Sequence, residues 1–335
     1  MSWRRMNALG AAIVAILLFQ ENGHGQTLVG IAYSSPSLVV APGQIVPVLM
    51  TGLKTILPTG TERAQSIPLP LTLAGVSVTF AQTPQYSRSL PLAAIQQFNQ
   101  CAGTNNPASD CLLTAITVQI PFDIVVPNPL IASPFFQPLS SLEIFENGVL
   151  SKSFIVSPVP DQIHMLQSCD ITNSAGIYGS CYAIVTHADG SLVLQAPRGP
   201  SGPPLTNSEA HPGETLVMYA FGLGSVSPAV QAGSASPAPA ATVISPIYLQ
   251  FDYRPNASPS APMLNSSLTT TTQPVFAGLT PGQVGLYQIN FVVPAPPAGT
   301  QVCGAPVESN LTISVTTADG RSLSGAAICV DTGYE

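Results

Sequence analysis

The sequence predicts an all-β protein built from antiparallel sheet, and three observations lead to this fold class. Short segments such as Val76 to Phe80 alternate apolar and polar residues, which is typical of strands with one buried face. Asn-Gly or Asp-Gly pairs stand between such segments at 147–148, 189–190 and 319–320, and these pairs favour tight hairpin turns. The pattern of the first half also returns in the second half.

The repeat begins with two related stretches, Ala41 to Leu53 and His211 to Leu223. Each opens with a Pro-Gly turn, continues as an apolar strand and ends on Gly-Leu, where glycine lets the chain leave the sheet. Later segments recur in the same order, pairing 71–80 with 247–255, 116–122 with 286–294, and 142–156 with 311–330. We therefore expect the two halves to share one strand order, with the tips at 147–148 and 319–320 in equivalent places.

The N-terminus has the pattern of a secretory signal peptide. Arg4 and Arg5 precede an apolar run over residues 8–19, and small residues stand before a predicted cleavage ahead of Gln26. The run is short for a membrane span, so a retained N-terminal anchor is the weaker alternative, and we expect no transmembrane anchor after cleavage. The mature chain is then secreted or attached to the cell surface.

Composition excludes some classes of partner. Loss of residues 1–25 removes two arginines and one glutamate, which takes the formal net charge from -7 to about -8. Nucleic acid is therefore not an expected partner. Although the chain has 34 prolines, its hydrophobic fraction of 45% is higher than disordered chains carry. The expected partner is an extracellular protein or polysaccharide of unknown identity.

The cysteines suggest three local disulfides. In an exported chain an even number of cysteines points to disulfides, and nearest-neighbour pairing closes one loop or hairpin each time. The expected pairs are Cys101 with Cys111, Cys169 with Cys181, and Cys303 with Cys329. A metal site is the rival reading, but the chain has no CxxC spacing and no histidines clustered with these cysteines.

Residues 27–40 are expected to form a first edge strand, followed by strands over 46–51 and 76–80. The segment from Gln82 to Asp110 is read as an insertion without a counterpart in the second half. There Leu92, Ile95 and Phe98 recur every three residues, which predicts a short helix capped by Ser89.

A Pro/Gly-rich linker is expected over residues 197–204, because this stretch has almost nothing to bury. The hairpin before it, around Asp189-Gly190, could belong to either half or to the contact between them.

The stretch HPGETLVMYAFGLGSVSP, with FAGLTPGQVGLYQINFVVP and a closing Asp-Gly hairpin, resembles an uncharacterised C-terminal domain family of secreted proteins from Solibacter and other Acidobacteria. Each half also resembles, more loosely, the IPT/TIG branch of immunoglobulin-like domains. The resemblance implies two tandem immunoglobulin-like antiparallel β-sandwiches, here with a short helical insertion in the first. It implies no activity. The expected organisation is a signal peptide over 1–25, a first sandwich over 27–160, a disulfide-closed hairpin and linker over 161–204, and a second sandwich over 205–335.

No catalytic site is expected from the sequence. His164, His187 and His211 have no recognisable nucleophile nearby in the sequence, and the chain lacks GxSxG and HExxH motifs. The carboxylates are scattered, and paired-acid catalysis would need two of them close in space; those considered are Asp123, Glu143, Glu146, Asp161, Asp170, Asp189 and Asp252. We expect no metal, no cofactor and no enzymatic activity.

One aromatic residue is a weak candidate for ligand binding. Tyr248 alternates with Leu249 and Phe251 and so shares a face with Gln250 and Asp252, where a sugar ring could stack. A solvated or covered sheet surface is the simpler interpretation. The expected function is a non-enzymatic structural or adhesive module at the cell surface, and the alternative is an extracellular carbohydrate- or peptide-binding protein. The third hypothesis is a hydrolase, which convergence of His187 or His211 with a serine and an aspartate in one cleft would favour.

Overall fold

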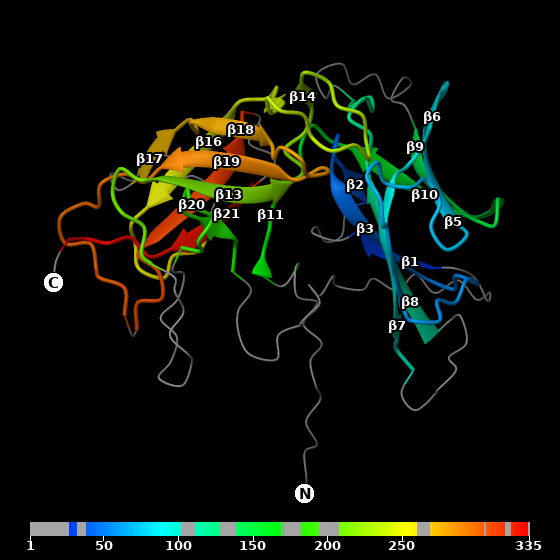
Figure 1. Ribbon diagram of the computed structural model, residues 1–335, viewed down its shortest axis with the longest axis horizontal. Coiled ribbons are helices and arrows are strands. Elements are labelled where there is room, and N and C mark those ends of the chain that lie inside the picture. The colour runs from blue at the N-terminus through cyan, green and yellow to red at the C-terminus, as the bar shows by residue number, and fades with distance from the viewer. Residues whose placement is uncertain are drawn as a thin grey trace, which may run out of the picture.

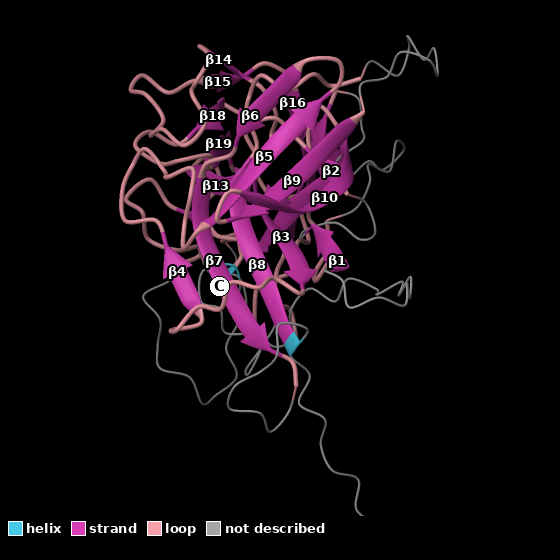
Figure 2. Cartoon of the chain, turned by 90° about the vertical axis from the view of Figure 1, so that its right-hand side faces the viewer, coloured by secondary structure: helices cyan, strands magenta, loops and turns pink. Residues whose placement is uncertain are grey.

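The computed structural model describes residues 27–31, 38–101, 111–127, 139–168, 170, 182–193, 208–259, 269–304, 306–318 and 323–333. Within these ranges the protein is all-β, and its strands form four sheets. The early strands lie at one end of the molecule and the late strands at the other (Figure 1), and turns and loops connect them (Figure 2). No helix in the described part of the chain is long and apolar enough to cross a bilayer. The expected signal peptide and linker lie outside the described residues.

Two five-stranded sheets make up the first half. The order of one sheet is β1 (Thr27–Ile31), β3 (Ile45–Thr51), β8 (Leu112–Gln119), β7 (Leu92–Asn99) and β4 (Thr61–Arg63). The order of the other is β2 (Val39–Val40), β10 (Val149–Pro158), β9 (Ser140–Glu146), β5 (Val76–Gln82) and β6 (Tyr86–Ser89). The expected single edge strand over 27–40 is therefore two strands, because β1 and β2 join different sheets.

The second half also has two sheets. The first runs β11 (His164–Met165), β13 (Thr215–Phe221), β19 (Tyr287–Val292), β18 (Phe276–Leu279), β15 (Thr242–Val243) and β14 (Val226–Ser227), and β12 (Val185–Thr186) also pairs with β13. The second runs β17 (Thr269–Thr272), β16 (Ile247–Asp252), β20 (Leu311–Thr317) and β21 (Leu323–Ile328).

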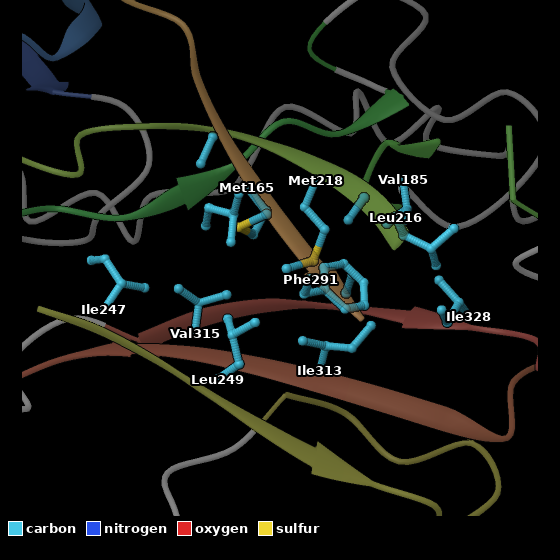
Figure 3. Packing of buried hydrophobic residues seen from close by; sticks show 14 of the residues in the cluster. Met165, Val185, Leu216, Met218, Ile247, Leu249, Phe291, Ile313, Val315 and Ile328 are labelled. Carbon is cyan, nitrogen blue, oxygen red and sulfur yellow. The ribbon is translucent and has the colours of Figure 1, made fainter. Parts of the chain in front are cut away.

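A separate apolar core fills each half. In the second half, Leu216 and Met218 of β13 and Phe291 of β19 face Ile313 and Val315 of β20 across the space between the sheets (Figure 3). The first half has a comparable cluster drawn from β3, β8, β5 and β9. Burial of apolar area contributes roughly 25 cal/mol per Å², so two such clusters can stabilise a chain in which only 7% of residues are charged.

Strand order corresponds between the halves. The series β1-β3-β8-β7-β4 matches β11-β13-β19-β18-β15, and β10-β9-β5-β6 matches β21-β20-β16-β17. The crossing from one sheet to the other also matches. Val40 pairs in parallel with Pro158, and Ala210 pairs in parallel with Val330. Both crossings directly precede a Pro-Gly turn.

The tip at Asn147-Gly148 joins β9 to β10 as an antiparallel hairpin. Both residues have positive φ, 51° and 78°, as a tight hairpin turn requires. The pair β20 and β21 forms the corresponding antiparallel hairpin, but its expected tip, Asp319-Gly320, lies outside the described residues.

The predicted helical insertion is wrong. Over residues 82–101 the structure has strands and turns and no helix, and β6 and β7 occupy the places that β17 and β18 hold in the second half. The pairing of β7 with β8 shifts between Leu92 and Ala94, which is a β-bulge. A bulge adds one residue, so Leu92 and Ile95 point to the same side although they are three residues apart. Their helix-like spacing therefore comes from an irregular strand.

The segment that precedes the linker belongs to the second half. Met165 pairs with Ala220 and Val185 pairs with Met218, so β11 and β12 both extend the sheet along β13. Ala183 and Val193 pack in the same core. The sequence did not show which half this hairpin packs on, and these pairings place it on the second half.

The contact between the halves has an apolar part, Phe122 packed against the core of the second half, and a polar part around Gly233. Gln119, 1% exposed, accepts a hydrogen bond at Oε1 from Gly233 N at 2.5 Å, and Leu69 N donates to Gly233 O at 2.8 Å. Gly233 has φ +81°, and a Cβ there would lie 2.9 Å from the Pro91 ring. Glycine is thus required on both steric and conformational grounds.

Two of the expected disulfides are present. Cys101–Cys111 joins the end of β7 to the start of β8, with 5.3 Å between Cα atoms. Cys303–Cys329 ties the residue after β21 to the loop before β20, with 5.9 Å between Cα atoms. Cys169 and Cys181 lie outside the described residues. Disulfides of this kind persist in oxidising compartments, which agrees with an extracellular protein.

The strand assignment of residues 92–99 gives a testable contrast between two positions. Ile95 is 0% exposed and Phe98 is 44% exposed. Replacement of Ile95 by alanine should lower the free energy of unfolding by about 2 to 5 kcal/mol, whereas Phe98→Ala should change it by less than about 1 kcal/mol. Urea denaturation of both variants measures this, and equal losses would contradict the strand assignment.

The two disulfides should contribute different amounts to the free energy of unfolding, because they close loops of different length. The bridges close loops with sequence separations of 26 and 10 residues, so restriction of the unfolded chain stabilises the protein by roughly 3.5 and roughly 2.7 kcal/mol respectively. The Cys303→Ser/Cys329→Ser variant should accordingly be the less stable one in denaturant unfolding. A larger loss from the Cys101→Ser/Cys111→Ser variant would contradict this order.

Candidate functional site

Titratable side chains gather where the chain crosses between the two sheets of the second half. This segment, residues 208–214, leads into β13 and contains Ser208, Glu209, His211 and Glu214. Two other segments reach it: the turn after β12, which carries His187, and the residues after β21, which carry Asp331. We call this group the crossing cluster.

His187 lies at the centre of the crossing cluster and is 8% exposed. Its Nδ1 is 2.5 Å from Oε1 of Glu214. On the other side of the ring, Nε2 is 3.1 Å from Oγ of Ser208 and 3.4 Å from the Ser208 carbonyl oxygen. The imidazole therefore bridges a carboxylate and an exposed hydroxyl.

Local structure holds each member in place. His187 begins a tight turn in which Gly190 N donates to its carbonyl oxygen at 3.0 Å and its own N–H donates to Ser191 O at 2.9 Å. Ser208 forms a parallel bridge with Val193. Glu214 follows the Pro-Gly turn and accepts a hydrogen bond at Oε2 from the His211 N–H at 3.0 Å. Backbone pairing, rather than side-chain packing alone, positions all three.

The charge state of Glu214 follows from its partners. Burial alone would raise the pKa of this carboxyl group, but the hydrogen bonds from His187 and from the His211 N–H outweigh it and lower the pKa below its ordinary value. Glu214 is therefore a carboxylate at neutral pH. This carboxylate can accept the Nδ1–H of His187, and in the neutral tautomer that donates from Nδ1 the lone pair on Nε2 faces Ser208.

A second pair lies at the edge of the crossing cluster. His211 Nδ1 is 3.3 Å from Oδ2 of Asp331, and both side chains are well exposed. The pKa of Glu209 is raised by burial and by the negative charge of Asp331, with His211 acting in the opposite sense. The surroundings of Ser208 are thus acidic.

The crossing cluster has a counterpart without titratable groups in the first half. There Gln44 occupies the place of Glu214, and its Oε1 accepts a hydrogen bond from Ala41 N at 2.9 Å. The backbone bonds agree as well: Gln44 N donates to Ala41 O at 3.2 Å, and Glu214 N donates to His211 O at 3.0 Å. Both halves share the backbone geometry of this turn, but only the second half has a histidine and a carboxylate at it.

Of the remaining sequence candidates in the described part of the chain, His164 and Asp170 contact each other. His164 pairs with Asp170 at 2.8 Å, and Asp123 lies 3.8 Å from Arg88 and accepts a hydrogen bond from Tyr86 OH at 2.7 Å. Asp189 binds Ser191 within its own turn. Glu146 accepts bonds from Thr55 N and Ser151 Oγ, and these structural contacts lower its pKa against the effect of burial.

Glu143 lies on β9 opposite Thr79, and Asp161 is buried. The described residues contain no group of three or more histidine, cysteine or acidic side chains placed to hold a metal ion.

Tyr248 lies on the predicted face of β16, opposite the core residues Leu249 and Phe251. It is half-buried, and its neighbours on that face, Gln250 and Asp252, are buried. Asp252 is engaged by Arg254, whose Nε lies 2.8 Å from Oδ2. Little open surface surrounds the ring.

Another sheet surface offers more aromatic area. On β13 the core takes Leu216, Met218 and Ala220, so Val217, Tyr219 and Phe221 face outward. Tyr219 pairs with Gln288 of β19, and Phe276 of β18 pairs with Asn290. We call Tyr219, Phe221, Phe276, Gln288 and Asn290 the aromatic face.

The five residues of the aromatic face are half-buried and uncharged, and His164, which pairs with Phe221 and contacts Asp170, borders them. The ring of Phe276 lies across Gly278, where a Cβ would come within 2.6 Å of its Cζ. Gln288 Nε2 donates to Asn290 Oδ1 at 3.2 Å. Rings and amides therefore lie together on a neutral sheet surface. The alternation in β13 was visible in the sequence, but both alternating sets are apolar, so it did not show which set faces outward.

Comparisons with known proteins do not assign this chain to a family. No family model matches it, and no curated protein matches its sequence.

The lowered pKa of Glu214 makes stability depend on pH. A group whose pKa is lower in the folded state stabilises the protein above its unfolded pKa, here about 4.5, and this contribution is lost as the pH falls through the folded value. Wild type should have a higher melting temperature than Glu214→Gln at pH 7, and the difference should shrink below about pH 4.5. Melting curves from pH 3 to 7 measure it, and a difference that grows on acidification would contradict the assignment.

Proposed function

We propose that the protein is an exported β-sandwich module with a structural or adhesive role at the cell surface, and that this role does not depend on catalysis. In this proposal each half is an immunoglobulin-like sandwich and the two are tandem copies. The shared strand order supports it, because one sheet of each half follows the pattern A-B-E-D and the other the pattern C-F-G of immunoglobulin domains.

The aromatic face is the observation that favours adhesion. Aromatic rings beside amide side chains suit sugars, since a ring stacks on the apolar face of a sugar and amides bind its hydroxyl groups. The five residues of the face are uncharged, Asp170 borders them through His164, and the whole chain is acidic. A neutral polysaccharide is therefore favoured over an anionic one.

A second candidate is an extracellular carbohydrate- or peptide-binding protein that takes a free ligand. It would use the same aromatic face, with Tyr248 as a further contact proposed from the sequence. The two candidates differ in their ligand: the adhesive module binds a ligand that is attached to a surface, and this candidate binds one that is free in solution.

Retention on insoluble neutral polysaccharides tests the adhesive role. The protein, expressed from Gln26 onward, should bind at least one of cellulose, chitin and curdlan, and Tyr219→Ala/Phe276→Ala should weaken binding by about tenfold or more, since each lost stacking contact is worth roughly 1 kcal/mol. Phe98→Ala is the matched control, because Phe98 is an exposed aromatic residue on β7, in the first half of the protein.

Three outcomes would count against parts of the proposal. Equal retention of the double variant would exclude the aromatic face as the adhesive surface. Loss of retention in Tyr248→Ala alone would move the site to β16. Binding to soluble oligosaccharides but not to the insoluble polymers would favour the second candidate.

A further inference from the structure

Ser208, His187 and Glu214 stand in the order of a nucleophile, a general base and an orienting carboxylate. The hydroxyl oxygen is 3.1 Å from Nε2, and Nδ1 is 2.5 Å from the carboxylate. Both distances lie within hydrogen-bonding reach, as a serine relay requires. Such relays are recognised by their geometry rather than by the order of their residues in the sequence. The three residues therefore form no sequence motif.

The environment of each member suits its role. Ser208 is exposed, so an external group can approach its Oγ. His187 is buried on its carboxylate side, and the Glu214 side chain is only 23% exposed, which limits competition from water for the Nδ1–H. The second contact of Nε2, to the Ser208 carbonyl oxygen at 3.4 Å, is longer than its contact to the hydroxyl. The shorter contact favours the hydroxyl as the partner of Nε2.

We propose that this relay makes Ser208 a nucleophile that hydrolyses carboxylic esters, an activity that goes beyond the structural or adhesive role. Ser208 Oγ attacks the acyl carbon while its proton passes to His187 Nε2. The bond from the acyl carbon to the leaving oxygen then breaks, and Nε2 returns the proton to that oxygen, releasing an alcohol. Water then attacks the acyl-serine in the same way: the water gives a proton to Nε2 and its oxygen bonds to the acyl carbon. The bond from the acyl carbon to Ser208 Oγ breaks, and Nε2 returns the proton to Oγ. The products are one alcohol and one carboxylic acid.

Charge around Ser208 restricts the substrate. The carboxylates of Glu209 and Asp331 interact with each other next to this segment, and Asp189 lies in the His187 turn. Anionic esters would be repelled, so the relay should prefer uncharged acyl groups. This preference separates it from a site for phosphate or sulfate esters.

A fluorophosphonate probe tests the proposal, because it phosphonylates only activated serines. The purified mature protein should be labelled at Ser208, as located by peptide mass spectrometry, and Ser208→Ala should abolish that label. Hydrolysis of p-nitrophenyl acetate should accompany labelling and stop in Ser208→Ala.

Glu214→Gln is the informative second variant. Gln44 holds the equivalent place in the first half with the same backbone bond, so this variant should keep its fold. It lacks the orienting negative charge, and labelling should fall by about a hundredfold or more, within the range that general-base catalysis contributes. Ser153→Ala, an exposed serine on β10, is the control and should label like wild type.

Two results would overturn the proposal. A folded protein that is not labelled at Ser208 between pH 6 and 9 would exclude an activated nucleophile. Labelling that is unchanged in both Glu214→Gln and His187→Gln, with melting curves showing both folded, would exclude the relay. Neither result would bear on polysaccharide retention, so the two proposals fail independently.

Discussion

The crossing of the chain from one sheet to the other is the constraint on which both halves depend. A short segment must pair in parallel with the last strand of one sheet, at Val40 with Pro158 and at Ala210 with Val330. It must then turn at Pro-Gly and enter the other sheet. The backbone groups of the crossing that do not pair with a strand need other hydrogen-bond partners. The side chain two residues after the proline meets this need by accepting the N–H three residues before it.

The same constraint creates the candidate site. In the first half the accepting side chain is Gln44, which is neutral and makes a structural bond. In the second half it is Glu214, whose second oxygen is free to bind His187. One change from amide to carboxylate at a position that the fold already holds rigid thus places a charge beside an imidazole. The sheet crossing fixes the position of the Glu214 carboxylate in advance, and His187 and Ser208 supply the groups that could react.

Stability in this chain relies on apolar cores and covalent links more than on ion pairs. Charged residues are 7% of the sequence, and exposed ion pairs such as Arg88 with Asp123 contribute little. The two described disulfides lie at strand ends, where fraying would otherwise begin. The contact between the halves combines polar bonds around Gln119 and Gly233 with Phe122, which packs against the core of the second half. The steric fit of Gly233 makes the contact specific.

The sequence by itself determined the all-β class, the hairpin at Asn147-Gly148 and the two described disulfide pairs, because alternation, turn residues and short cysteine separations are local properties. It misread residues 92–98 as a helix, since a β-bulge gives two residues on one side of a strand a helical spacing. Only the tertiary structure decided that Tyr219 faces outward and Met218 inward, because both alternating sets are apolar. It alone brought Ser208 to His187, 21 residues apart in the chain. Such a contact depends on which strands pair, and pairing between distant segments is a property of the whole fold.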